Sequence, residues 1–435
     1  MNDISRRSVL KLGAISGLAL SSATVLAACT STGTSQVKSG NITLDLWTHD
    51  SGYEKYFTSE AAALTPYSVN TTKYSSADLV TKLIATASAG RALPDMAGIE
   101  IGQFSRLMKN GIAGEMFEDL TPHLNSVKND LIQARLAPFS VDGKVYGLDS
   151  DNPLVVYYYR ADLFDKYKIP NPQTWEEFAG FGASFYQKEK IALLPVNTGP
   201  TNADVSSRFM MFLLQRGGAF FDKSGNVTVD SPEAVDTLQF IVDGLKSGFI
   251  IGLDNFYGGS IQAAFKSSQL IGAAMPDWYN VYGIQATVPE QKGLWKIRPM
   301  PMFSGGGLAT STQGGTGFGA LKGQHSAAVI DLLAKTYLTV SGQVQRFKDV
   351  GYLPTLKSAY GSAELLSYAD PFLSGQKTFE IYAPLADKGP NFYQSPNLSI
   401  LNDSLGGPLL DAYKGNISPS TAIKNGVAAY TQQTK

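Results

Sequence analysis

The chain has 435 residues, of which 36 are basic and 37 are acidic, and its formal net charge is −1. A chain of this length is expected to form two domains, and its balanced charge, without a long basic run, gives no electrostatic basis for binding nucleic acid. The three histidines lie far apart in sequence and the single cysteine has no partner, so the composition predicts no disulfide, no metal site and no cofactor.

Residues 1–28 have the layout of a cleaved export signal. A basic opening precedes an apolar, small-residue run at 12–26, which is shorter than the ~20 residues of a transmembrane helix. The run ends in "LAAC" at 26–29, which resembles the lipobox of bacterial lipoproteins, where the cysteine sulfur receives a diacylglycerol. We therefore expect Cys29 to be lipidated, residues 29–40 to form a flexible tether, and the protein to be anchored to the cell membrane outside the cytoplasm.

The segment "SRRSVLK" at 5–11 indicates the export route. It resembles the twin-arginine signal, but Val9 stands where that signal usually has phenylalanine. Such signals are addresses read by a receptor rather than anchors. An ordinary secretory signal that happens to contain two arginines is the alternative.

From residue 41 onward, strand patterns alternate with helix patterns. Alternating or continuous apolar runs predict strands at 41–47 and 154–160, and helical spacing predicts helices at 76–90, from Trp175 onward and at 231–248. A capping box formed by Thr174 and Glu177 makes Trp175 a packing residue at a helix start. This alternation predicts an α/β fold, with a mixed, mainly parallel sheet flanked by helices.

The order of several motifs between residues 41 and 356 resembles the carbohydrate-binding family of extracellular solute-binding proteins of ABC importers, which includes maltose-binding protein. The matching stretches include "ITLDLW", "ASAGRALPDM", "DGKVYGLDSDNPLVVYYYRADLF", "FKSSQLIGAAMPDWY" and "GGTGFGALKG". The chain departs from the family at "FTSEAAALTPYSVN", and beyond residue 357 the match is weak.

The resemblance implies a two-lobed, type II periplasmic-binding-protein-like fold. The chain would cross the hinge near 152–156, 299–306 and 351–356. The N-terminal lobe would comprise 41–152 plus 305–352, and the C-terminal lobe 154–300 plus 355–435. Such a protein, a monomer without catalytic activity, captures a sugar or oligosaccharide by hinge closure and delivers it to the permease subunits of an ABC transporter.

Candidate ligand residues follow from the chemistry of a sugar, which presents apolar C–H faces and hydroxyl groups. A receptor needs aromatic platforms together with carboxylates and amides on loops at strand ends. Trp278 follows an apolar strand and matches the family's tryptophan at the sugar-binding loop, although it could instead be a buried core residue. The other candidates, which could also cap strands or local turns, are Trp47, His49, Asp50, Glu100, Asp149, Asp151, Asn152, Asp277, Tyr279, Gln313, Gly314, Gly315 and Thr316.

Other functions remain as alternatives. Tyr157 and Tyr159 share one face of a predicted strand, and paired tyrosines hold metal in related ferric-ion binders, although packing is the default in mid-strand. A glycoside-acting enzyme would need only two suitably spaced carboxylates, but no nucleophile elbow of the G-x-S-x-G type is present. A sugar-sensing or adhesion lipoprotein on the same fold is the third alternative.

Overall fold

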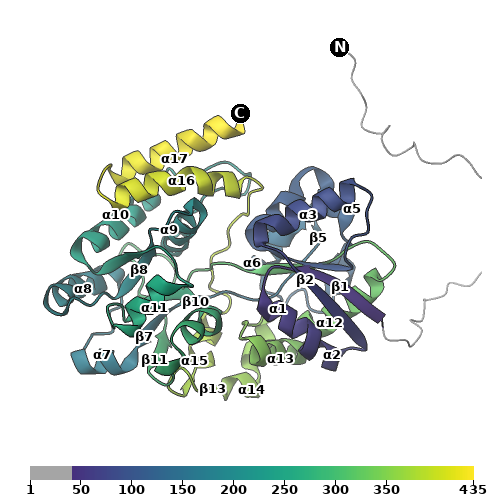
Figure 1. Cartoon of the computed structure of the whole chain (residues 1–435), viewed down its shortest axis with the longest axis horizontal. Coiled ribbons are helices and arrows are strands. Elements are labelled where there is room, and N and C mark those ends of the chain that lie inside the picture. Colours follow the sequence, from purple (N-terminus) through teal and green to yellow (C-terminus); the bar gives the residue numbers. More distant parts are fainter. Residues whose placement is uncertain (1–41) are drawn as a thin grey trace, which may run out of the picture. The chain divides into compact units, whose positions relative to one another are not determined.

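The computed structural model describes residues 42–435, and these form one compact unit (Figure 1). The predicted signal peptide, the lipidation site Cys29 and the tether lie outside the described residues. Within residues 42–435, no helix is both long enough and apolar enough to span a bilayer.

The first lobe is built on a five-stranded sheet with the order β2-β1-β3-β12-β6. Its strands are β1 (Ile42–Thr48), β2 (Tyr67–Lys73), β3 (Met96–Glu100), β6 (Leu148–Asp149) and β12 (Thr316–Ala320). Pairings of β1 with β2 and β3 are parallel, whereas β12 pairs antiparallel with both β3 and β6. Strand β12 thus joins strands that precede it by more than 200 residues. The first lobe is therefore built from two separate segments of the chain.

Helices cover both faces of the sheet at β3, β6 and β12, whose residues are almost all buried, whereas residues of the outer strands β1 and β2 alternate between buried and exposed. One cluster packs Leu44 and Phe318 against α12, and another packs Ile99 against Leu83 of α3. The predicted helix at 76–90 is confirmed as α3, in which the Ser75 hydroxyl caps the first turn. Helices of this lobe are α1 (Ser51–Lys55), α2 (Ala61–Leu64), α3 (Ser76–Ser88), α4 (Ile101–Phe104), α5 (Ile112–Met116), α6 (Gln133–Leu136), α12 (Ser326–Tyr337) and α13 (Val340–Val350).

The second lobe contains a three-stranded sheet, β10-β7-β11, and a separate parallel pair, β8 (Leu194–Asn197) with β9 (Ile250–Leu253). Strands β7 (Val155–Arg160), β10 (Gly272–Pro276) and β11 (Trp295–Arg298) pair only antiparallel. The expectation of a mainly parallel sheet is therefore wrong for these three strands. Strand β7 starts at the first hinge crossing and runs away from it. Strand β10 ends beside the start of β7, where Pro276 pairs with Val155, so it runs in the opposite direction.

Helices surround these strands, and Figure 1 shows α16 and α17 alongside α9 and α10. The capping box of Thr174 and Glu177 is confirmed at the start of α8, where Trp175 is fully buried and donates from Nε1 to Gln215 Oε1 at 2.8 Å. Helices of this lobe are α7 (Ala161–Tyr167), α8 (Trp175–Glu189), α9 (Asn202–Arg216), α10 (Pro232–Ser247), α11 (Gly259–Lys266), α14 (Ala363–Leu366), α15 (Phe379–Tyr382), α16 (Leu398–Tyr413) and α17 (Pro419–Thr434).

Short elements complete the chain. They are the strand pairs β4 (Ser140–Val141) with β5 (Lys144–Val145) and β13 (Ala369–Asp370) with β14 (Gln376–Lys377), and the 3-10 or π segments η2 (Tyr56–Glu60), η3 (Ser105–Gly111), η4 (Thr121–Leu124), η5 (Ala137–Phe139), η6 (Asn280–Gln285), η7 (Pro289–Gln291), η8 (Lys357–Gly361) and η9 (Ala383–Leu385).

Hydrogen bonds between distant segments indicate where the chain crosses from one lobe to the other. Val155 N donates to Ser311 O at 3.0 Å, and Ser150 N donates to Thr316 O at 2.8 Å, so residues 150–155 and 311–316 run side by side in opposite directions. Upstream, Leu308 N donates to a carbonyl of α9, which ties that stretch to the second lobe. We therefore propose that the second crossing lies at 312–315 rather than 299–306, and that the lobes comprise 42–152 plus 316–352 and 154–311 plus 355–435.

Candidate functional site

A cavity of about 360 Å³ lies where the two lobes meet, and we call it the central cavity. The first lobe and the hinge segments supply most of its wall, and the second lobe supplies three aromatic side chains. The lining residues are His49, Asp50, Tyr53, Glu100, Asp151, Tyr257, Trp278, Tyr282, Gly314, Gly315, Thr316 and Tyr352.

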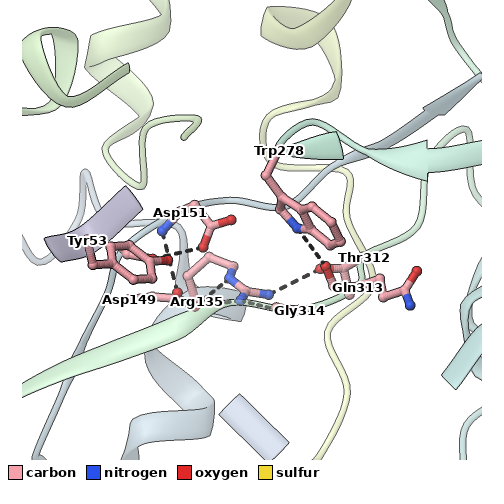
Figure 2. A network of polar contacts seen from close by, with 9 residues as sticks. Tyr53, Arg135, Asp149, Asp151, Trp278, Thr312, Gln313 and Gly314 are labelled. Carbon is pink, nitrogen blue, oxygen red and sulfur yellow. Dashed lines mark hydrogen bonds and ion pairs between the residues drawn. The ribbon is translucent and has the colours of Figure 1, made fainter. Parts of the chain in front are cut away.

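Aromatic rings form three stacked pairs in this wall, one of which is Tyr53 on Tyr352 at 4.8 Å and 29°. Trp278 is partly exposed at the end of β10, and the Tyr257 ring stacks on it with a centroid distance of 6.2 Å and an angle of 19°. The Trp278 indole donates from Nε1 to Gln313 O at 3.2 Å, which fixes the ring against the hinge (Figure 2). Tyr282 stacks on Tyr352 at 5.5 Å and 17°. The cavity therefore presents flat apolar surfaces from both the second lobe and the hinge.

Polar side chains at the ends of β1 and β3 face the same cavity. Glu100 begins α4 and accepts a hydrogen bond from Gly102 N at 3.0 Å, and burial raises the pKa of its carboxyl group. Asp50 begins α1 in the same way and accepts from Gly52 N. His49 Nε2 lies 3.1 Å from Thr316 Oγ1, and burial lowers the pKa of its imidazole, which keeps the ring neutral near pH 7.

A buried network behind the cavity holds the hinge segments together, as Figure 2 shows. Arg135 donates from Nε to Asp149 Oδ2 at 2.8 Å, and its other nitrogens donate to Thr312 Oγ1 and Gly314 O, both at 3.2 Å. Burial raises the pKa of Asp149, and the positive charge of Arg135 opposes that rise. Arg135 therefore links Asp149, at the end of the first lobe, to Thr312 and Gly314 of the second crossing.

Asp151 lies at the edge of that network and also lines the cavity. Its Oδ1 accepts from the Ser150 hydroxyl at 3.0 Å, and Ser150 in turn bonds to the Tyr53 hydroxyl at 2.5 Å (Figure 2). Burial raises the pKa of the Asp151 carboxyl group. Its position on the first crossing places a carboxyl group of the cavity wall on the hinge itself.

The structure brings eight of the predicted residues together in the central cavity. They are His49, Asp50, Glu100, Asp151, Trp278, Gly314, Gly315 and Thr316. Gly314 and Gly315 have φ values of 87° and 121°, in the region that favours glycine, so they serve the turn as well as the cavity wall.

The structure places the other six predicted residues outside the central cavity, each with a different packing role. Asp149 pairs with Arg135, and Gln313 lines a neighbouring cavity. The Trp47 ring packs edge-on to Tyr74 at 5.0 Å on the face of β1 opposite the Leu44 cluster. The remaining three are buried at or near the hinge, where Asn152 Nδ2 donates to Ala386 O, Asp277 Oδ2 accepts from Leu353 N, and the Tyr279 hydroxyl donates to Phe256 O.

Four tyrosines of the cavity were not predicted: Tyr53, Tyr257, Tyr282 and Tyr352. The sequence positions of two of them could have indicated that they line the cavity. Tyr282 lies four residues after Trp278, about one helical turn, and Tyr352 directly follows Gly351 at the predicted third crossing. Tyr257 and Tyr53 lie in a loop and a short helix, where an aromatic residue is equally typical of packing.

The tyrosine pair of the ferric-ion alternative lies in the core of the second lobe. Tyr157 is fully buried, and its hydroxyl donates to Leu193 O at 2.6 Å. Arg298 lies over the rings of both Tyr157 and Tyr159. These contacts engage the pair in packing.

Comparisons with known proteins show which proteins this chain is similar to in sequence and in fold. The arabinooligosaccharide-binding protein of Bacillus subtilis (strain 168) is 26% identical over 411 residues, covering 90% of this chain and 92% of the relative. The GacH receptor of Streptomyces glaucescens has a TM-score of 0.73 at 19% identity, covering 90% of this chain and 98% of that one. The galacto-N-biose-/lacto-N-biose I-binding protein of an ABC transporter from Bifidobacterium longum has the same TM-score and identity, covering 91% and 98%.

The two solved structures show that this chain has the two-lobed fold of such binding proteins. The family comparison covers more than half of the chain, because residues 56–371 match the family described as bacterial extracellular solute-binding protein. This chain therefore belongs to the family of bacterial extracellular solute-binding proteins.

Proposed function

We propose that this protein captures a neutral sugar or oligosaccharide between its lobes and delivers it to the permease of an ABC importer. The observation that carries the proposal is the central cavity itself, which combines the Trp278–Tyr257 and Tyr282–Tyr352 stacks with carboxylates at strand ends. Aromatic faces pack on the C–H faces of a sugar ring, and carboxylates accept hydrogen bonds from its hydroxyl groups.

The ligands named for similar proteins support the same class of substrate. The Bacillus subtilis relative is described as binding arabinooligosaccharides, and the Streptomyces glaucescens receptor was solved in complex with acarbose. Because lining residues come from both lobes and the hinge, a bound sugar would make its full set of contacts only in the closed form. Closure around the ligand is the signal that the permease would recognise.

We expect binding to need no metal and to leave the sugar intact. Among residues 42–435 no cluster of three acidic, histidine or cysteine side chains is arranged to hold a metal ion. Thermal melts with arabino-, malto- and galactooligosaccharides should give a higher melting temperature with at least one series, because a ligand of the native state stabilises it. Chromatography should recover that sugar unchanged, and EDTA should leave its affinity unaltered.

Three results would count against this proposal. Failure of every neutral sugar to raise the melting temperature would contradict the substrate class. Cleavage of the sugar would favour the glycoside-acting alternative, and loss of affinity in EDTA that added metal restores would reveal a metal site.

The protein is proposed to work as a monomer tethered outside the cytoplasm by a lipid on Cys29, after export through the twin-arginine route. Replacement of Cys29 by alanine should leave the protein without lipid, either released or retained as precursor, because the sulfur is the acylated atom. Sugar affinity should stay the same, since the anchor lies at least 13 residues before the first described strand. Fractionation with metabolic lipid labelling measures the first effect. A Cys29→Ala protein that still carries lipid would rule out this anchor.

A further inference from the structure

A separate cavity of about 200 Å³ lies beside the third crossing, and we call it the hinge cavity. The first lobe contributes the end of α13 to its wall, and the second lobe contributes η6, β13 and the start of α15. Adjacent residues face different cavities here, because Asp277 lines the hinge cavity and Trp278 lines the central cavity, and Gly351 and Tyr352 divide in the same way. The third crossing and η6 therefore form a wall that the two cavities share.

Two buried oxygen atoms of the hinge cavity have no hydrogen-bond partner among residues 42–435. They are Asp277 Oδ1 and Thr378 Oγ1, on side chains of residues that are only 3% and 2% exposed. The other carboxylate oxygen of Asp277 accepts from Leu353 N at 3.1 Å, which holds the side chain at the third crossing. A buried oxygen without a partner costs stability, so we expect the cavity to hold a group that donates hydrogen bonds to these two atoms.

The wall of the hinge cavity is acidic. It contains the carboxyl groups of Asp277, Asp349 and Asp370, whereas Lys348 is the one basic residue among the described residues of the wall, and its Nζ pairs with Glu364. Within the described chain, no basic side chain forms an ion pair with Asp277 or Asp370. Burial raises the pKa of the Asp277 carboxyl group, and a bound positive charge would oppose that rise. The wall therefore favours a cation over an anion or a neutral ligand.

The size and the remaining surface of the cavity favour an organic cation over a metal ion. A volume of about 200 Å³ is several times the roughly 30 Å³ that one water molecule occupies, so a short carbon chain fits. The rings of Phe347, Tyr368 and Tyr382 supply apolar surface for that chain. No group of three acidic, histidine or cysteine side chains in the described part of the chain is arranged to hold a metal ion. A primary ammonium group, in contrast, carries three N–H donors and needs only acceptors such as Asp277 Oδ1 and Thr378 Oγ1.

We propose that the hinge cavity binds a small organic cation with a primary ammonium group, which donates hydrogen bonds to Asp277 Oδ1 and Thr378 Oγ1. The carbon chain of this ligand lies against Phe347 and Tyr382. Because both lobes line the cavity, the ligand touches both sides of the hinge. Its chemistry differs from that of the neutral sugar proposed for the central cavity, and its binding does not depend on that sugar.

Calorimetric titration and thermal melts with propylammonium chloride test this site, with sodium chloride and tetramethylammonium chloride at the same ionic strength for comparison. Propylammonium should raise the melting temperature more than either salt, because a ligand of the native state stabilises it and tetramethylammonium has no N–H group to donate. Asp277→Asn keeps an oxygen for Leu353 N but removes the charge. It should weaken propylammonium binding by at least about ten-fold, as expected for losing a hydrogen bond to a charged group.

Thr378→Val tests the second acceptor without changing a charge. It removes a hydroxyl group that no residue in 42–435 contacts by a hydrogen bond, so the melting temperature without ligand should not fall. Propylammonium binding should nevertheless weaken by about ten-fold, because the ammonium group loses an acceptor. The matched control is Asp236→Asn, at an exposed position of α10 that does not line the hinge cavity, and it should leave the affinity unchanged.

Three results would overturn the ammonium site. They are equal effects of the three salts on the melting temperature, wild-type affinity for propylammonium in Asp277→Asn, and wild-type affinity in Thr378→Val. Any of them would leave the hinge cavity to water molecules. A failure of every neutral sugar to bind would instead contradict only the proposed function, since the propylammonium titration is carried out without sugar.

Discussion

Replacement of Trp278 by alanine is expected to weaken sugar binding by about ten- to hundred-fold, which corresponds to ~1.5–3 kcal/mol for the burial of an aromatic ring. The indole is partly exposed in the cavity wall, stacked on Tyr257 and bonded to Gln313 O. Because it is not a buried core residue, its loss should lower the melting temperature only modestly. Calorimetric titration and thermal melts of the same variant measure the two effects.

Trp47→Ala is the matched control for this prediction. Trp47 is also partly exposed, but it packs on Tyr74 and does not line the central cavity. Its replacement should lower the melting temperature while leaving the affinity unchanged. A Trp278→Ala variant with normal affinity and a large drop in melting temperature would remove Trp278 from the binding site.

The second large effect is expected at the buried ion pair behind the hinge. Arg135→Met should lower the free energy of unfolding by about 3–5 kcal/mol, because it leaves the Asp149 carboxylate buried without its positive partner. The side chains of Arg135 and Asp149 are only 3% and 1% exposed, so solvent does not screen the loss. Denaturant titration of the variant and the wild type measures the difference.

The pH dependence of this variant follows from the raised pKa of Asp149. With Arg135 removed, the folded protein binds a proton at Asp149 more tightly than the unfolded chain does, so the stability of the variant should fall as the pH rises above the unfolded value of ~3.9. The loss relative to wild type should therefore be larger at pH 8 than at pH 5. A loss that does not change with pH would show that the packing of Arg135, rather than its charge, stabilises the hinge.

Two further variants isolate the charge effect. The double replacement Arg135→Met with Asp149→Leu should recover part of the lost stability, because it removes both charges from the interior. Lys335→Met breaks a pair of similar length with Asp331, 2.7 Å apart, whose side chains are 44% and 41% exposed. That change should cost less than about 1 kcal/mol, because exposed ion pairs contribute little. A double variant less stable than Arg135→Met alone would contradict the explanation.

Helix starts in this protein could be predicted from sequence because their causes are local. Ser75, Thr174 and Ser231 each accept a hydrogen bond from a backbone N–H three residues later, at the starts of α3, α8 and α10. Such a cap needs only its own neighbours in the chain. The polar residues at the ends of β1 and β3 were also foreseeable, because strand ends of an α/β sheet meet along one edge.

Strand direction in the second lobe and the place of the second crossing were not foreseeable in this way. Both depend on which distant segments bond together, as Val155 does with Ser311 and β7 does with β10. An apolar strand can pair with either a parallel or an antiparallel neighbour, so its composition does not reveal which segment it pairs with.

The aromatic residues that line the central cavity were the hardest to predict, because tertiary packing decides which rings face it. Trp278 and Tyr279 are adjacent, yet one lines the central cavity and the other is buried with its hydroxyl on Phe256 O. Tyr257 and Tyr352 come from segments almost 100 residues apart and reach the same cavity only because the hinge brings the lobes together. The sequence alone identifies the family pattern, the helix caps and the strand-end acids, because those follow from neighbouring residues. Which aromatic rings face a ligand is decided only when distant segments pack, because the same ring is equally suited to a core or to a binding surface.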